Sequence, residues 1–199
     1  YRLTGDLHLA LGEMDEAERC FQHAYQHGWD PYPGYAELLH LRGRGEEAIR
    51  GLERAATMSN WVAGERKARY LAHAAQIAAM LGQREKARAL LHELDTESRV
   101  PESGVTAAQV LHARAELAWL DGRTEEAQRC MHGAREVLQQ QGAVIEAARI
   151  RLRLAELLAR QGDHGAARME LSAAENVFQA AGARGYLDRC LALRDMLGP

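Results

Sequence analysis

A short phrase recurs five times along the chain: a glycine, then a helical stretch with a small, a bulky and a small residue on one face, the last being replaced by leucine in the third copy. The second and third members stand four and seven positions after the first, and such residues are neighbours on a helix surface. The five glycines are 31, 39, 40 and 40 residues apart. Self-similarity at this period is typical of a helical solenoid. The five sets are Gly12 with Ala17, Phe21 and Ala24; Gly43 with Ala48, Leu52 and Ala55; Gly82 with Ala87, Leu91 and Leu94; Gly122 with Ala127, Met131 and Ala134; and Gly162 with Ala167, Leu171 and Ala174.

The residue types in this phrase suit a packed pair of helices. Glycine ends a first helix because it adopts left-handed backbone angles at little steric cost. The small residues let the second helix approach its partner closely, and the bulky residue fills the groove between them. A single pair cannot bury its whole apolar face, so neighbouring pairs must stack. The phrase therefore predicts repeated helix pairs that share one continuous core.

Turn residues divide the chain into these pairs without suggesting a second domain. We expect eleven helices and no sheet, with Thr96 to Gly104 as the longest loop and Thr106 with Gln109 capping the helix that follows. Asp163 is expected to cap a second helix that Gly182 closes. The expected repeats span about 1–28, 32–58, 61–95, 105–141 and 144–181, and a final helix at 184–197 is placed to cover the fifth pair.

Composition excludes several classes of protein. The formal charge of -3 over 199 residues argues against a basic nucleic-acid-binding surface. Cys20, Cys130 and Cys190 stand far apart, which favours neither a disulfide framework nor a zinc site and indicates the reducing cytoplasm. There is no apolar run long enough for a membrane span and no secretion signal. The chain opens at Tyr1 inside a repeat, so we expect it to be part of a longer protein.

No catalytic motif or cofactor-binding loop is present in the sequence. Gly43-Arg-Gly45 follows no expected strand and lacks the third glycine of a dinucleotide-binding loop. His23 and His27 have the spacing of two metal ligands on one helix face, but no carboxylate or cysteine supports them, so we predict no metal site. Arginines 149, 151, 153 and 160 form the densest basic stretch, which we interpret as a solvated, ion-paired helix surface. We predict a protein that is not an enzyme and needs no cofactor.

The repeated phrase resembles the tetratricopeptide repeat (TPR), and the resemblance covers nearly the whole chain. The first repeat fits the motif best, whereas the later repeats carry alanine where the first has Gly5, lack the closing proline, and are longer from the third onward. The resemblance implies an all-α, right-handed superhelical solenoid of five TPR-like antiparallel helix pairs plus a C-terminal capping helix. The matching residues of the first repeat are Tyr1, Gly5, Gly12, Ala17, Phe21 and Ala24.

In proteins of this kind the first helices line a concave binding groove. One equivalent position would carry Asp6, Glu37, Gln76, Glu116 and Glu156 in turn, an acidic row, while Trp119 would be an amphipathic anchor. Two interpretations stay open, because helix surfaces are commonly rich in glutamate without any binding role. The candidate groove residues for binding are Asp6, Glu37, His40, Gln76, His112, Glu116, Trp119 and Glu156, and the same register places Arg2, Leu9, Arg69 and Arg149 beside them.

A second resemblance is to the helical-repeat region of MalT-like and LuxR-type bacterial transcriptional regulators. It rests on Gln26-His-Gly-Trp-Asp-Pro-Tyr-Pro-Gly34, on the later repeats of about 40 residues, and on Phe178-Gln-Ala-Ala-Gly-Ala183. It implies a regulatory domain that binds a protein, a peptide or a small inducer in the groove and contacts neither nucleic acid nor membrane. The alternatives are a free-standing scaffold for complex assembly and the repeat tail of a multidomain signalling enzyme. The sequence leaves the oligomeric state open.

Overall fold

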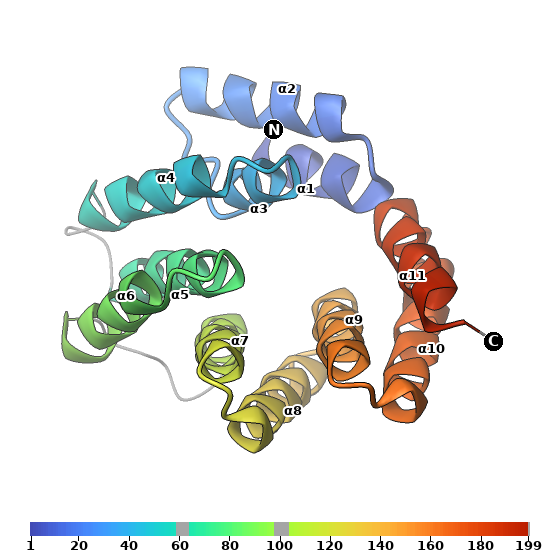
Figure 1. Cartoon of the computed structure of the whole chain (residues 1–199). Coiled ribbons are helices and arrows are strands. Elements are labelled where there is room, and N and C mark those ends of the chain that lie inside the picture. Colours follow the sequence, from blue (N-terminus) through green and yellow to red (C-terminus); the bar gives the residue numbers. More distant parts are fainter. Residues whose placement is uncertain (59–63, 98–103, 199) are drawn as a thin grey trace.

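The computed structural model describes residues 1–58, 64–97 and 104–198. Within these ranges the chain folds into eleven α-helices and contains no strand, which confirms the predicted all-α solenoid (Figure 1). The helices are α1 (Arg2–Leu11), α2 (Met14–Gln26), α3 (Gly34–Leu41), α4 (Gly45–Met58), α5 (Gly64–Met80), α6 (Arg84–Glu97), α7 (Gly104–Leu120), α8 (Thr124–Gln140), α9 (Val144–Arg160), α10 (His164–Ala181) and α11 (Arg184–Leu197).

Consecutive helices pack as pairs through the repeated phrase. Each second helix, from α2 to α10, turns its small-bulky-small face into the core, and the three residues that follow the glycine in each set are buried except the half-buried Ala55. Phe21 and Met131, the bulky residues of the first and fourth sets, are completely buried. Each Å² of apolar surface that is buried contributes about 25 cal/mol to the free energy of folding, so these contacts are the main term that stabilises the fold. The prediction that the triplets form the pair interfaces is confirmed.

The turns within and between pairs use the backbone freedom of glycine. Gly12 has φ 82° and ψ 7°, so the chain reverses between α1 and α2 while the Gly12 N–H donates to the carbonyl of Leu9 at 3.1 Å. Asp163 caps α10 as predicted, because its side chain accepts from the Ala166 N–H at 3.0 Å, and Gly182 ends that helix with φ 67°.

The expected cap and loop before α7 need correction. Thr106 does not cap a helix, because α7 already begins at Gly104 and the Thr106 hydroxyl, buried inside it, donates to Glu65 at 3.2 Å. Tertiary contact with α5 therefore overrides the local capping pattern. The expected loop from Thr96 also starts too early, since α6 continues to Glu97; its residues 98–103 lie outside the described ranges.

The solenoid bends until its two ends meet. Helix α11 packs on α10, as expected of the final helix, and it also contacts α1, so that the described helices form a closed ring (Figure 1). The backbones of Gly12 and Gly185 approach so closely that a Cβ atom on Gly185 would lie 2.7 Å from the Gly12 nitrogen. Ala10 of α1 packs on the apolar cluster that α7 to α11 share. The apolar layer thus continues across the closure, and the first helices face the inside of the ring.

Candidate binding surface inside the ring

The inner face of the ring brings the predicted acidic row together. Each member stands six residues before the glycine that ends its first helix, so equivalent helices present it to the same side. We call these five residues the inner row: Asp6 on α1, Glu37 on α3, Gln76 on α5, Glu116 on α7 and Glu156 on α9.

Arginines of α9 and α11 pair with glutamates of the inner row. Arg153 on α9 donates to both carboxylate oxygens of Glu116, from Nε at 2.6 Å and from Nη2 at 2.7 Å. Its Nη1 donates to Glu156 at 2.7 Å, and Glu156 also accepts from Arg189 of α11 at 3.0 Å. Glu116 is only 2% exposed and Arg153 7%. The interpretation of the basic stretch as a solvated surface is therefore wrong for Arg153, which lies inside the ring.

A second ionic contact joins opposite ends of the chain. Glu37 of α3 pairs with Arg149 of α9 at 2.5 Å and accepts from the Tyr186 hydroxyl of α11 at 3.3 Å. The Arg149 guanidinium also lies 5.3 Å from the centre of the Tyr186 ring, within cation–π range. Residues separated by up to 149 positions in sequence therefore meet at one carboxylate, on the side of the ring where it closes.

Amides and histidines continue the network on α5 and α7. Gln109 donates to the side-chain oxygen of Gln76 at 2.6 Å. His112 Nε2 lies 3.4 Å from Gln76 Nε2 and 3.3 Å from Glu116 Oε1. His112 is buried, so it links the amide pair of α5 and α7 to the Glu116–Arg153 ion pair. Four of the eight predicted site residues thus lie in one network: Gln76, His112, Glu116 and Glu156.

The ionic contacts determine which inner groups carry charge. Burial alone would raise the pKa of Glu116, but hydrogen bonds from Arg153 and His112 outweigh it and lower the pKa to about 2. Burial lowers the pKa of His40, and Arg153 nearby lowers it further. His73 of α5 behaves likewise, with its pKa far below the ordinary value because of burial and the charge of Arg149. Burial raises the pKa of Asp6, and Glu37 adds to this effect.

The structure places the remaining predicted residues with different consequences. His40 is half-buried among charged side chains, and its Nδ1 has no hydrogen-bond partner in the part of the chain that is described. Trp119 is half-buried and packs on the apolar cluster of α7 to α11. Leu9 was expected to face the groove, and this is wrong. It is buried with Phe21 and Leu38 in the core of the first pair, because its side of α1 faces α2 and α3.

Sequence reasoning missed the basic partners of the inner row. Arg189 and Tyr186 were read only as part of a capping helix, although Arg189 stands nine residues before Gly198, as Arg153 does before Gly162. That shared spacing was the available signal. It could not be used without knowing that α11 comes round to meet α1 and α3. Conversely, Arg151 of the basic stretch points away from the ring interior and pairs with Glu170 at 2.6 Å.

Other candidate chemistry is accounted for by packing. The rings of His23 and His27 stack with their centres 4.1 Å apart, and Tyr1 packs on His23 at 4.0 Å. Among the described residues, no three histidine, cysteine, aspartate or glutamate side chains are grouped to hold a metal ion. The described helices also include none with the length and apolar character needed to cross a membrane.

Comparison with known proteins agrees with the observed architecture. Two segments, residues 108–132 and 148–171, match the family model of the tetratricopeptide repeat. They cover the turns from α7 into α8 and from α9 into α10, so the matches fall on the fourth and fifth pairs and not on the first, which was expected to fit the motif best. No curated protein and no solved structure matches the chain. The two matches support a tetratricopeptide-repeat protein, whose repeats generally form a protein-binding module.

Proposed function

We propose that this chain is a non-enzymatic protein- or ligand-binding module that serves as the regulatory domain of a larger bacterial transcriptional regulator. The observation that carries the proposal is the stack of helix pairs, two of which match a family whose repeats generally mediate protein contacts. The surface we assign to the partner is the inner face of the ring, where Asp6, Glu37, His40, Gln76, Trp119 and Glu156 are partly exposed. His112 and Glu116 are buried and hold this surface in place through their hydrogen bonds with Gln76 and Arg153. A peptide, a protein segment or a small inducer would be recognised there in the cytoplasm.

Binding at this surface would compete with contacts inside the ring. Glu37 of α3 contacts Arg149 of α9 and Tyr186 of α11. A ligand carboxylate that pairs with Arg149 would replace Glu37 in this ion pair and weaken the contact of α3 with α9 and α11. The ring closure would then lose one of its polar contacts, and the population would shift toward an open solenoid. A ligand can drive this shift only as far as its affinity differs between the closed and open states. Such a change of shape is what a regulatory domain needs to pass on.

Peptide titration tests the inner face directly. Fluorescein-labelled peptides with free terminal carboxylates, selected from a random displayed library, should bind saturably and raise the radius of gyration in X-ray scattering. His40→Ala and Trp119→Ala should each weaken binding by about tenfold, which corresponds to about 1.4 kcal/mol. His92→Ala on the exposed face of α6 is the matched control and should bind normally. Selected peptides that bind all three variants equally well would remove the inner face from consideration.

The regulatory context has its own test. If the chain belongs to a transcriptional regulator, the same polypeptide should contain a helix-turn-helix or a nucleotide-binding module. The complete gene sequence tests this. A full-length protein with neither module would instead favour the scaffold alternative.

A further inference from the structure

One contact recurs at the junctions between pairs. We call the glycine that ends each first helix the hinge glycine: Gly12, Gly43, Gly82, Gly122 and Gly162. The residue six positions after a hinge glycine, on the second helix, contacts the residue just before the next hinge glycine. The same spacing relates Arg168 of α10 to Leu197 of α11, and Arg168 Nη1 donates to the Leu197 carbonyl at 3.3 Å. Gly198 therefore stands at a hinge position, with φ 65°. The earlier examples are Glu18 with Arg42, Arg88 with Asp121 at 3.2 Å, and Gln128 with Gln161 at 3.4 Å.

Helix α11 is thus equivalent to the first helix of a sixth pair. In the five complete pairs the residue seven positions before the hinge is a buried glycine or alanine, and at Gly5 an added Cβ would lie 2.6 Å from the Phe21 ring of the second helix. The corresponding residue of α11 is Leu191, which is 50% exposed. Arg194, three residues further on, is also exposed, although α3, α5, α7 and α9 bury an alanine or leucine there. The face of α11 that a second helix would cover is open.

The neighbouring face of α10 is open in the same way. At two junctions the next second helix contacts its predecessor: Lys86 contacts Glu53, ten residues after Gly43, and Glu170 contacts Arg135, thirteen residues after Gly122, at 3.3 Å. The equivalent residues of α10 are Ser172 and Glu175. Both line a pocket of about 580 Å³ between α10 and α11. The pocket lies where the second helix of a sixth pair would pack.

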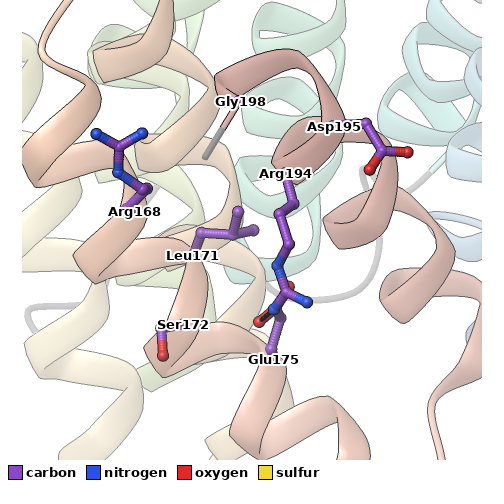
Figure 2. Close-up of a pocket in the computed structure, with 7 residues that line it drawn as sticks. All are labelled: Arg168, Leu171, Ser172, Glu175, Arg194, Asp195 and Gly198. Carbon is purple, nitrogen blue, oxygen red and sulfur yellow. Dashed lines mark hydrogen bonds and ion pairs between the residues drawn. The ribbon is translucent and has the colours of Figure 1, made fainter.

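The side chains around the pocket define its charge. Arg168 and Arg194 flank Leu171, and Arg194 reaches from α11 to Glu175 on α10 (Figure 2). The ion pair engages Glu175 Oε2. Glu175 Oε1 is buried and has no hydrogen-bond partner among the described residues. A donor arriving with a docked helix would satisfy this oxygen.

The backbone at Gly198 differs from that of the glycine between α1 and α2. Gly12 reverses the chain with ψ 7°, whereas Gly198 has ψ -178°. The residue that follows Gly198 in the sequence is a proline, and the residue before a proline favours an extended ψ. None of the other five hinge glycines precedes a proline. A helix that brings a basic residue would complement the Glu175 oxygen in this pocket that lacks a partner among the described residues.

We propose that the pocket between α10 and α11 binds an amphipathic helix of a partner protein, which completes a sixth helix pair. The partner helix carries a small, a bulky and a small apolar residue with the spacing of the five internal sets. The residue directly before the bulky one is basic. It occupies the position that Glu170 has in α10 and contacts Glu175. The helix docks on α10 and α11, on the outside of the ring, and does not contact the inner row.

A peptide copied from the chain itself is a suitable probe. The labelled peptide has the sequence of residues 163–181 with the change Glu170→Arg, so that it presents Ala167, Leu171 and Ala174 together with the required basic residue. Fluorescence anisotropy with the whole chain should show saturable binding. The unchanged peptide, which presents a carboxylate to Glu175, should bind at least fivefold more weakly. A peptide that also carries Leu171→Asp should not bind.

Variants of the protein locate the site. Ser172→Trp fills the pocket from an exposed position and should weaken binding at least tenfold, whereas His92→Trp on α6 adds the same bulk elsewhere and should not. Glu175→Gln should remove the difference between the arginine and glutamate peptides. Absence of saturable binding, or equal binding by Ser172→Trp, would overturn the proposal. Inner-face peptides should still bind Ser172→Trp, so failure here is distinguishable from failure of the proposed function.

Discussion

Arg153 of α9 holds both carboxylate oxygens of Glu116 of α7, in a bidentate ion pair that the fold buries almost completely. Such a pair costs much of its attraction in desolvation, so it adds little net stability by comparison with apolar residues of the same size. Loss of one partner is a different matter, because the other charge then stays buried without compensation. The pair therefore specifies how α7 and α9 sit inside the ring more than it strengthens the fold.

Single substitutions of this pair should be far more damaging than the double one. We expect Glu116→Leu or Arg153→Met to lower the free energy of unfolding by about 3–5 kcal/mol, and the double variant to recover most of that loss. Urea unfolding followed by circular dichroism measures each value. Arg129→Met on the exposed surface of α8 is the control and should stay within about 0.5 kcal/mol of the parent. Additive losses in the double variant would mean that the two side chains do not depend on each other.

Acid should destabilise the protein in two steps. The lowered pKa values of His40 and His73 mean that the unfolded chain takes up protons below about pH 6.5 that the folded chain refuses, so stability falls as the pH drops through that range. Glu116, with its pKa of about 2 against 4.5 for the free group, adds a further loss between those values. The raised pKa of Asp6 works in the opposite direction and offsets part of the second step.

Urea midpoints measured from pH 7.5 to 3 check both steps. His73→Gln should flatten the dependence above pH 5, where one imidazole contributes up to about 1.4 kcal/mol per pH unit. Glu116→Gln should flatten it below pH 4.5. An unchanged slope in both variants would show that other groups control the acid sensitivity.

Closure of the ring should be sensitive to one added methyl group. The Cβ of Gly185→Ala would lie 2.7 Å from Gly12 N and 2.8 Å from its Cα, and backbone atoms there cannot move aside cheaply. We expect the variant to separate α11 from α1, with a larger radius of gyration in X-ray scattering and faster amide exchange in α1. Gly133→Ala on α8 is the matched control, because its nearest contact is a side-chain atom at 3.5 Å. The control should gain up to about 1 kcal/mol from helix propensity, and equal behaviour of the two would contradict the closure.

The stability of the first helix pair should depend on the combined size of the side chains at positions 5 and 21. Gly5→Ala places a Cβ 2.6 Å from the Phe21 ring and should cost about 1–3 kcal/mol by overpacking. The four later pairs have alanine at the Gly5 position and leucine or methionine at the Phe21 position. Gly5→Ala with Phe21→Leu should therefore be more stable than Gly5→Ala alone. Thermal unfolding of the three variants measures this, and a double variant worse than both singles would refute the pairing.

Much of the inner site could be read from the sequence because the repeat places equivalent residues on equivalent helix faces. Asp6, Glu37, Gln76, Glu116 and Glu156 were found in this way. The same reasoning failed for Leu9, which the aromatic core of the first pair takes up, and for Arg153, whose local pattern of alternating arginines looks like a solvated surface. Whether a polar residue on a helix is exposed depends on what packs opposite, and a helical pattern carries no information about that.

The sequence by itself determined the helix pairs, their hinges and the packing of their small-bulky-small faces, because all three depend on residues close together in the chain. Only the tertiary structure decided that the ends meet, that Glu37 contacts Arg149 and Tyr186, and that arginines inside the ring pair with Glu116 and Glu156. The reason is cumulative geometry. A small rotation at each junction, set by side-chain packing between pairs, adds up around the solenoid until α11 lies against α1.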